Sequence, residues 1–408
     1  MNSKPEISVT LRKFPYPYKA MFAICSDVDH AISLSAYVEF MKYLNTEEQT
    51  AYGWGVGLEV SNSFWFFNAT GDNQLSYFHG LSKQESDFAS VCRELWESGH
   101  IDTLHSYGNF DTGGFERKYA EMAMDELEKQ SRVIPVWVNH GNDNNHQKIG
   151  PYPNFNGAQP DSTAYHFDLL KQHGTSFFWA GRTTHVCGQN ANPSLNHQAQ
   201  QLLQVLVLKT KYRNTNRPLP DPANHLLIPT KMADGNELIE FQRFISRYGE
   251  VKNTDLNDLG VQLKESNLSA LVKSGGYMLL YTHMNENLPE GQPLPETVDA
   301  GFRRLAKYSH EKDLLVTTNS RLLQYADVSE HLSWKASRES GITQLKLFRD
   351  DKRPLSPGEL QGLTFYCPNP ESLRLYCGDT ILPVQVNPAD SSGKSSVSVI
   401  WEALQFPT

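Results

Sequence analysis

The sequence has little of what marks membrane, nucleic-acid-binding or disulfide-stapled proteins. No apolar run approaches the roughly 18 residues that a membrane-spanning helix needs. Lys and Arg number 37 against 46 Asp and Glu, a formal charge of -9, so duplex nucleic acid and anionic membranes are not expected partners. The five cysteines include no CxxC pair, which argues against a disulfide framework or a cysteine-based zinc site.

The N-terminal stretch 1–19 has no apolar signal core. Together with the cysteine usage, this predicts a cytoplasmic protein in which Cys367 and Cys377 are reduced. Two prolines near Tyr16 disfavour a helix, so we expect an extended N-terminal arm over 1–19. A length of 408 residues allows more than one domain.

A rhythm of apolar strand, polar loop and amphipathic helix recurs about six or seven times over residues 20–329. This alternation is typical of an α/β barrel or a doubly wound parallel sheet. The predicted strands include 20–24, 133–138, 176–180, 276–281 and 314–317, and the predicted helices include 35–44, 83–99, 116–132, 255–274, 295–311 and 319–326. Residues 185–235 are hard to place, because 198–208 fits a helix or a strand.

The pattern of apolar and polar residues changes after about residue 330. Short apolar runs are separated by Pro, Gly, Asn and Asp over residues 330–408. We expect antiparallel strands in a small C-terminal β-sandwich that serves as an accessory domain.

Asp27 and Asp29 follow the first apolar run, two residues apart. In extended backbone, side chains two apart point the same way, so both carboxylates can face one point beyond the strand end. Two close carboxylates need a metal, a base or a shared proton to offset their repulsion. The alternative is a polar strand end that makes turn and cap hydrogen bonds.

Further polar side chains follow other predicted strands: His105, His140, Arg182 and His283. Such residues converge at one face of a barrel. His105 and Asn109 are four apart, and on a helical turn both can reach the metal that Asp29 binds. Imidazole and hard oxygen ligands favour Zn, with Mn, Co and Fe as alternatives.

Each of these side chains also has a structural interpretation. His105 fits a hydrogen-bonded loop residue, and His140 fits a metal ligand, a substrate donor or part of a polar turn. Arg182 can pair with Asp27 or form a surface ion pair. Two aromatic residues can stack on a sugar or fill the core, namely Tyr107 and Trp179.

Three of these motifs together resemble the polysaccharide deacetylase (NodB-homology) family. Asp27-Val28-Asp29 resembles a D-x-D variant of its first motif, and the stretch from His105 to Asn109 matches the first two positions of its His-Ser/Thr-x-x-x-His motif. Leu280-Tyr281-Thr282-His283 is similar to its late Leu-x-His motif, with Leu one position early. The D-x-D pair also resembles the nucleophile loop of haloacid-dehalogenase-type phosphatases, but the later acidic pair of that family is missing.

The resemblance implies a distorted (β/α)7-type barrel and a metal-dependent hydrolase that removes an N-acetyl or similar acyl group from an amino sugar or a surface-polysaccharide precursor. It implies Asp27 as general base and His283 as general acid. The metal ligands would be Asp29, His105 and Asn109, with Asp111 or His140 as substitutes. Substrate contacts are expected from His140, Arg182, Tyr107 and Trp179.

Two other functions remain open. A glycoside hydrolase on a similar barrel would use two separated carboxylates and no metal. A catalytically silent protein would bind carbohydrate without cleaving it.

Overall fold

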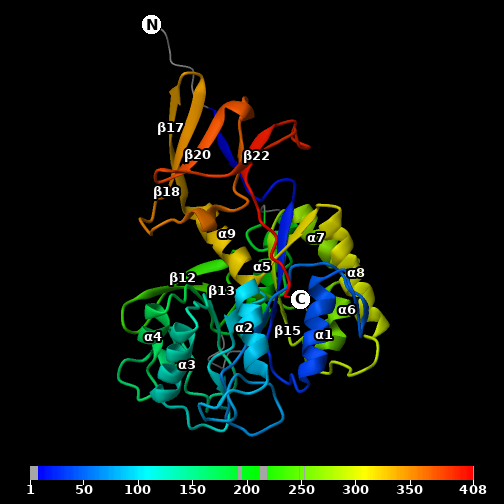
Figure 1. Cartoon of the computed structure of the whole chain (residues 1–408), viewed down its shortest axis with the longest axis vertical. Helices are drawn as coiled ribbons and strands as arrows, with labels where there is room; N and C mark the ends of the chain where they lie inside the picture. Colours follow the sequence, from blue (N-terminus) through cyan, green and yellow to red (C-terminus); the bar gives the residue numbers. More distant parts are fainter. Residues whose placement is uncertain (1–7, 192–194, 212–217, 248, 252, 408) are drawn as a thin grey trace.

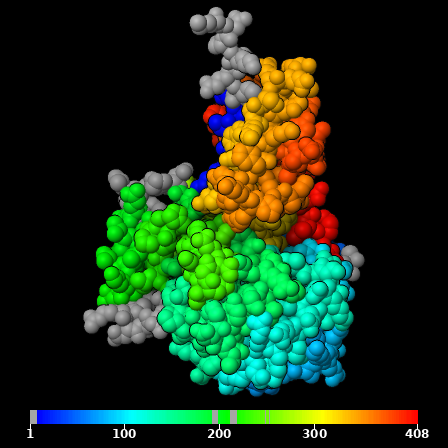
Figure 2. Space-filling model, turned by 90° about the vertical axis from the view of Figure 1, so that its left-hand side faces the viewer, coloured from blue at the N-terminus to red at the C-terminus, as the bar shows by residue number. Residues whose placement is uncertain are grey.

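The computed structural model describes all residues except 1–7, 192–194, 212–217, 248, 252 and 408. It confirms the α/β class: parallel sheets with helices form the lower part in Figure 1, and a smaller unit of strands stands above them. Figure 2 shows this second unit, in orange, rising from the α/β part.

A five-stranded parallel sheet contains the first acidic strand. Its order is β11-β14-β15-β2-β16. Every side chain of β2 is buried, as expected for a central strand with both faces covered. The strands are β2 (Ala20–Ser26), β11 (Thr183–Thr184), β14 (Arg243–Phe244), β15 (Tyr277–Thr282) and β16 (Leu314–Val316).

A six-stranded sheet, in the order β12-β13-β10-β9-β7-β5, continues the architecture. It is parallel except for the hairpin of β12 with β13. Only Gln242 separates β13, in this sheet, from β14, in the five-stranded sheet. At the opposite ends of the two sheets, the described strands β5 and β16 do not pair with each other, so no closed barrel forms. The strands are β5 (Asn62–Phe64), β7 (Ile101–Leu104), β9 (Val136–Val138), β10 (Phe177–Trp179), β12 (Leu227–Lys231) and β13 (Glu237–Phe241).

The helices bury apolar faces against these sheets. The predicted helix 83–99 is shorter, and ends at Gly99, whose left-handed φ of 80° suits a glycine cap. The helices are α1 (Leu34–Asn45), α2 (Phe88–Ser98), α3 (Arg117–Lys129), α4 (Phe167–Gln172), α5 (Leu195–Lys211), α6 (Leu259–Gln262), α7 (Glu265–Ser274), α8 (Glu296–His310) and α9 (Asn319–His331). None in the described part of the chain is long and apolar enough to span a bilayer.

Two segments differ from the sequence-based expectation. The helix expected over 255–274 is broken into the 3-10 turn η2 (Leu256–Asp258), α6 and α7. The break lies at Lys264, whose extended backbone separates α6 from α7, while the Gln262 side chain at the end of α6 donates to the carbonyl oxygens of Ile245 and Tyr281, at 2.7 and 2.8 Å. Residues 198–208, ambiguous from sequence, belong to helix α5.

Short pieces complete the α/β part. They are β3 (Gln49–Thr50) with β4 (Gly53–Trp54), β6 (Phe67–Asn68) with β8 (Gly108–Asn109), and the 3-10 turn η1 (Asn156–Ala158).

The C-terminal unit has two four-stranded sheets, whose buried apolar side chains belong to one cluster together with side chains of β2, β9, β10 and β15. One is β17-β18-β20-β21 and the other is β1-β19-β23-β22. Helix α9 passes directly into β17. The strands are β17 (Leu332–Glu339), β18 (Ile342–Arg349), β19 (Thr364–Tyr366), β20 (Leu373–Cys377), β21 (Thr380–Ile381), β22 (Val384–Asn387) and β23 (Ser396–Val399), with 3-10 turns η3 (Pro357–Leu360) and η4 (Pro370–Ser372).

One expectation for this unit is corrected, and the N-terminal arm gains a partner. Within the arm, β1 (Thr10–Arg12) is an extended strand that pairs antiparallel with β19 in the C-terminal unit. The strands are not all antiparallel, because β18 pairs in parallel with β20. Between those two strands the chain contributes β19 to the other sheet, and this crossover brings β20 back in the same direction as β18.

Stability is expected to fall in mild acid because His166 is buried uncharged. It packs against Tyr107, Phe115 and Trp137, and burial lowers the pKa of His166 from 6.5 to about 4. As the pH falls from 6.5 to 4, the unfolded chain therefore binds a proton that the folded chain does not bind. The free energy of unfolding falls by up to about 3 kcal/mol over that window. Stability above pH 6.5 is unaffected.

Urea unfolding from pH 7 to pH 4 measures this loss. His166→Asn keeps a donor for the Ala164 carbonyl, which lies 2.9 Å from Nδ1, and we expect its stability to depend less on pH in this window. His79→Asn, at an exposed site, is the control. An unchanged pH dependence in His166→Asn would contradict the assignment.

Candidate active site

Five side chains that can bind a metal or transfer a proton follow the carboxyl ends of four parallel strands. Asp27 and Asp29 follow β2, His105 follows β7, His140 follows β9 and His283 follows β15. The carboxyl ends of parallel strands point to the same edge, so residues far apart in sequence meet there. The predicted convergence of these five residues is present in the structure: all five line one cleft.

Asp29, His105 and His140 form a compact cluster. His105 Nε2 lies 2.8 Å from Asp29 Oδ2, and His140 Nδ1 lies 3.0 Å from Asp29 Oδ1. The two imidazole nitrogens are 2.9 Å apart. Two imidazole nitrogens and a carboxylate oxygen therefore converge, which makes this group able to hold a metal ion.

The remaining ring nitrogens of the two histidines face carboxylates. His105 Nδ1 is 3.6 Å from Asp27 Oδ1, and His140 Nε2 is 3.7 Å from Asp111 Oδ1. Histidines that bind metals commonly direct the second nitrogen to a carboxylate in this way. Neither of these two nitrogens has a hydrogen bond. Asp29 Oδ2 has none either, because the close contact of Asp29 Oδ2 with His105 Nε2 does not have hydrogen-bond geometry.

Gly141 makes the approach of Asp111 to His140 possible. A Cβ atom at position 141 would lie 1.7 Å from Asp111 Oδ1, and the φ of Gly141 is 80°. Both the contact and the left-handed backbone require glycine here.

Packing holds the two imidazoles in place. The buried Trp65 indole stacks on His105, with ring centres 5.8 Å apart, and meets His140 edge-on at 5.2 Å. Burial alone would raise the pKa of Asp29, but His140 and His105 hold it well below its usual range. Burial alone would lower the pKa of His140, but Asp29 raises it. Asp29 is therefore the local counter-charge for cationic groups in the cluster.

Asp27 is bound by an arginine that the sequence analysis did not assign. Arg243 donates to both oxygens of Asp27, at 2.6 and 3.1 Å, and is fully buried. Its guanidinium carbon lies 3.4 Å from the ring centre of Trp179 and 3.9 Å from that of Tyr281. Burial alone would raise the pKa of Asp27, but the charge of Arg243 brings it below the usual value. Asp27 is thus ionised and fixed in orientation.

His283 lies beside both carboxylates. Its Nε2 is 3.8 Å from Asp27 Oδ2 and 3.8 Å from Asp29 Oδ2. Its Nδ1 is 3.2 Å from the carbonyl oxygen of Thr254, which can only accept a hydrogen bond, so Nδ1 carries the proton of the neutral ring. Nε2 is then the nitrogen available for proton exchange in the cleft.

Comparisons of the chain with protein-family models, curated proteins and solved structures gave no match. The function must therefore be argued from the geometry of this site.

The cleft has a volume of about 740 Å³. Its wall combines apolar and aromatic side chains with several amides, as is usual for small-molecule sites. Besides the five residues above, its lining includes Asn139, Asn142, Asp143, Lys148, Asn154, Phe155, Trp179, Thr183, His185, Ile245 and Tyr281.

Asn109 and Tyr107 are directed away from this cleft, which corrects two expected roles. Ser106 has a left-handed φ of 53°, and Asn109 continues in strand β8, so the helical turn that would pair His105 with Asn109 does not form. The Asn109 amide lies 3.4 Å from the Thr70 hydroxyl. Tyr107 is fully buried against Trp137 and other core rings.

Arg182 differs from its expected pairing, whereas Trp179 lines the cleft, where its contact with substrate stays a prediction. Arg182 pairs with Glu240, at 3.0 and 3.1 Å, and not with Asp27, whose partner is Arg243. Trp179 does line the cleft, but its ring lies against Arg243. Its indole N–H donates to the Arg182 carbonyl oxygen. Trp179 therefore supports the Asp27 ion pair.

One sequence signal pointed to Arg243. It is one of two charges, with Glu240, in the otherwise largely apolar run from Leu238 to Ile245. A charge in a buried strand is rarely found without a buried partner.

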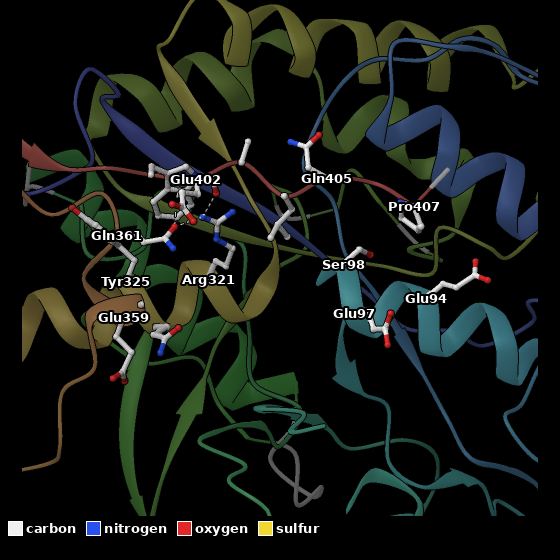
Figure 3. Close-up of a pocket in the computed structure, with 15 residues that line it drawn as sticks. Glu94, Glu97, Ser98, Arg321, Tyr325, Glu359, Gln361, Glu402, Gln405 and Pro407 are labelled. Atoms are coloured by element: carbon white, nitrogen blue, oxygen red, sulfur yellow. Dashed lines mark hydrogen bonds between the residues drawn. The ribbon is translucent and has the colours of Figure 1, made fainter. Parts of the chain in front are cut away.

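A second cleft of about 580 Å³ lies between α2, α9 and the C-terminal segment (Figure 3). Arg321 of α9 lines it and bonds to three neighbouring residues, Glu59, Gln361 and Glu402. It donates to Glu59 at 2.6 Å and to the Glu402 carbonyl oxygen at 2.7 Å, and lies 4.0 Å above the Trp401 ring. The Leu404 N–H donates to Glu59. These contacts hold residues 401–404 against α9 and Glu59, and none of the potential metal-binding groups found among the described residues lies in this cleft.

Proposed function

We propose that the protein is a metal-dependent hydrolase of the polysaccharide deacetylase type, which removes an N-acetyl or similar acyl group from an amino sugar. The observation that carries the proposal is the convergence of Asp29, His105 and His140 beside a separate, ionised Asp27. Two imidazoles and one carboxylate, with room for further ligands, are a common donor set of catalytic zinc and iron.

The donor set fits a divalent metal, for which zinc is our first choice and manganese, cobalt and iron are alternatives. Asp29 Oδ2 is buried without a hydrogen bond, and the second ring nitrogens of His105 and His140 face Asp27 and Asp111 at 3.6 and 3.7 Å. His140 takes the ligand position that the sequence motif gave to Asn109. When bound, such a metal polarises an acyl oxygen and lowers the pKa of water.

The side chains divide the proton transfers between them. Asp27 is held ionised by Arg243 and accepts a proton from the attacking water. His283 Nε2 lies 3.8 Å from an oxygen of each carboxylate; in the doubly protonated ring it would donate its proton to the leaving nitrogen, leaving the neutral ring with its proton on Nδ1. The cleft walls bind the sugar and exclude bulk water from the amide.

The finer fold belongs to the same proposal. We infer that the two parallel sheets, continuous through Gln242, form a distorted barrel that is open between β5 and β16. The two C-terminal sheets, whose buried apolar side chains belong to one cluster, would form a β-sandwich.

Metal analysis of the purified protein tests the proposal. We expect about one zinc per chain in the wild type after dialysis against zinc. Asp29→Ala and His140→Ala each remove a ligand and are expected to weaken binding by more than the roughly 10- to 100-fold that follows loss of a residue that only orients a ligand. Asn109→Ala is the matched control and should keep its zinc, because its amide faces Thr70.

Activity completes the test. The zinc-loaded protein should release acetate from an N-acetylated amino sugar. Absence of bound metal in the wild type, or full retention in Asp29→Ala, would exclude the metallohydrolase and favour a glycoside hydrolase or a binding protein. Bound zinc without acetate release from any acetylated amino sugar would exclude the deacetylase.

A further inference from the structure

The wall of the active-site cleft contains a lysine that the proposed chemistry does not use. Lys148 is only 8% exposed and is the sole Lys or Arg among the residues that line the cleft in the described part of the chain. A buried ammonium loses hydration and therefore needs a negative or polar partner. We propose that Lys148 binds an anionic group, a carboxylate or a phosphate, carried by the amino sugar; this inference rests on the proposed function.

The partner that Lys148 has in the protein is a weak one. Its Nζ donates to Asp143 Oδ1 at 3.1 Å, while the Asp143 side chain is 87% exposed. An ion pair with a solvated carboxylate contributes little, so a ligand anion can take its place. An ammonium has three N–H donors, and Asp143 uses one of them.

The ammonium lies over an aromatic ring, and the backbone segment that carries Lys148 is hydrogen-bonded to its neighbours. Nζ lies 5.3 Å from the ring centre of the buried Phe155. The Lys148 carbonyl oxygen accepts from the Gly157 N–H at 3.0 Å. The Gln147 side chain accepts from the Tyr107 N–H and donates to the Gly108 carbonyl oxygen. This segment is therefore ordered before a ligand arrives, which reduces the entropy cost of binding.

The same loop positions the lysine relative to the metal cluster. Asn139, which precedes His140, accepts from the Ile149 N–H at 2.9 Å and donates to its carbonyl oxygen at 2.7 Å. These bonds close the loop 139–149, so His140 and Lys148 are fixed on one frame. A ligand whose amide lies at the cluster can thus place a second group at Lys148.

A neighbouring amide supplies a neutral contact. Asn154 lines the cleft, and its Oδ1 is buried without a hydrogen-bond partner. Its Nδ2 lies 3.5 Å from Asp143 Oδ1, on the same wall as Lys148. An unpartnered acceptor beside an ammonium suits a sugar that carries a hydroxyl next to its anionic group.

Calorimetric binding to the zinc-loaded protein tests the inference with four probes: N-acetylglucosamine, its 1-phosphate, its 6-phosphate and its uronic acid. We expect at least one anionic probe to bind about 10- to 100-fold more tightly than the neutral sugar, as for hydrogen bonds to a charged group. The phosphates and the uronic acid distinguish the two sources of charge. Lys148→Met should abolish the preference with little change for the neutral sugar.

Two controls sharpen the result. Lys171→Met removes an exposed lysine of α4 that bonds Asn236, and should keep the preference. Asp143→Asn removes the charged partner of the Lys148 ammonium and should strengthen the preference for anionic probes. The inference fails if the wild type shows no preference, or if Lys148→Met retains it.

Binding and hydrolysis separate this inference from the proposed function. An anion preference that depends on Lys148 without acetate release would leave the inference standing and overturn the deacetylase. Acetate release with the same KM for neutral and charged probes would support the deacetylase and overturn the inference about Lys148.

Discussion

Asp27→Asn is expected to lower kcat for acetate release about 10²- to 10⁴-fold, the range that a positioned general base contributes. The amide of asparagine cannot accept the proton of water. Asp29, His105 and His140 are unchanged in this variant, so it should still bind zinc. Steady-state kinetics together with zinc content of the same samples measure both effects.

Asp161→Asn provides the matched control, because it makes the same chemical change at an exposed site. Its kcat should stay within about twofold of the wild type. If Asp27→Asn keeps its activity, Asp27 is not the base. If it loses zinc together with activity, Asp27 is a ligand of the metal, as its grouping with Asp29 and His283 would allow.

Arg243→Met is expected to reduce the free energy of unfolding by about 3–5 kcal/mol, the usual cost of leaving one partner of a buried ion pair alone. Asp27 is 2% exposed, so its carboxylate would lose its main counter-charge where water cannot replace it. Its pKa would rise, because burial opposes the charged form. Urea unfolding at pH 7 gives the free energy directly.

Lys307→Met is the control, since Lys307 makes an exposed i,i+4 pair with Glu311 and should matter by less than about 0.5 kcal/mol. The double variant Asp27→Asn with Arg243→Met should recover part of the loss, because no charge remains unpaired. A stability of Arg243→Met within about 1 kcal/mol of the wild type would show that the ion pair is not needed to keep Asp27 buried.

The strands that end at the site were predictable because their apolar residues and the polar residues after them are contiguous in sequence. The run that became β2 ends in Asp27 and Asp29, and the run that became β15 ends in His283. The rule that side chains converge beyond parallel strand ends then brought these together with His105 and His140.

The ligand set was not predictable from spacing alone. The four-residue interval between His105 and Asn109 implies a shared face only on a helical turn. The left-handed φ of Ser106 breaks that turn. Serine seldom adopts this backbone conformation, so the residue type does not predict it. His140, in a loop rich in Asn, had several uses open to it until its distance to Asp29 was known.

Pairings between distant segments were beyond sequence reasoning for a different reason. Nothing near β1 signals a strand partner in the C-terminal unit, since register depends on shape and packing that form only in the folded chain. The same holds for Arg243, whose partner Asp27 is 216 residues away.

The pairing of β1 with β19 also has a consequence for synthesis on the ribosome. Arg12 and Tyr366, which are hydrogen-bonded in the folded protein, are 354 residues apart. At about 5–20 residues per second, β1 waits on the order of 20–70 s for its neighbour to be translated. During that time its backbone N–H and C=O groups can pair with other chains. The brevity of β1, only three residues, limits this exposure.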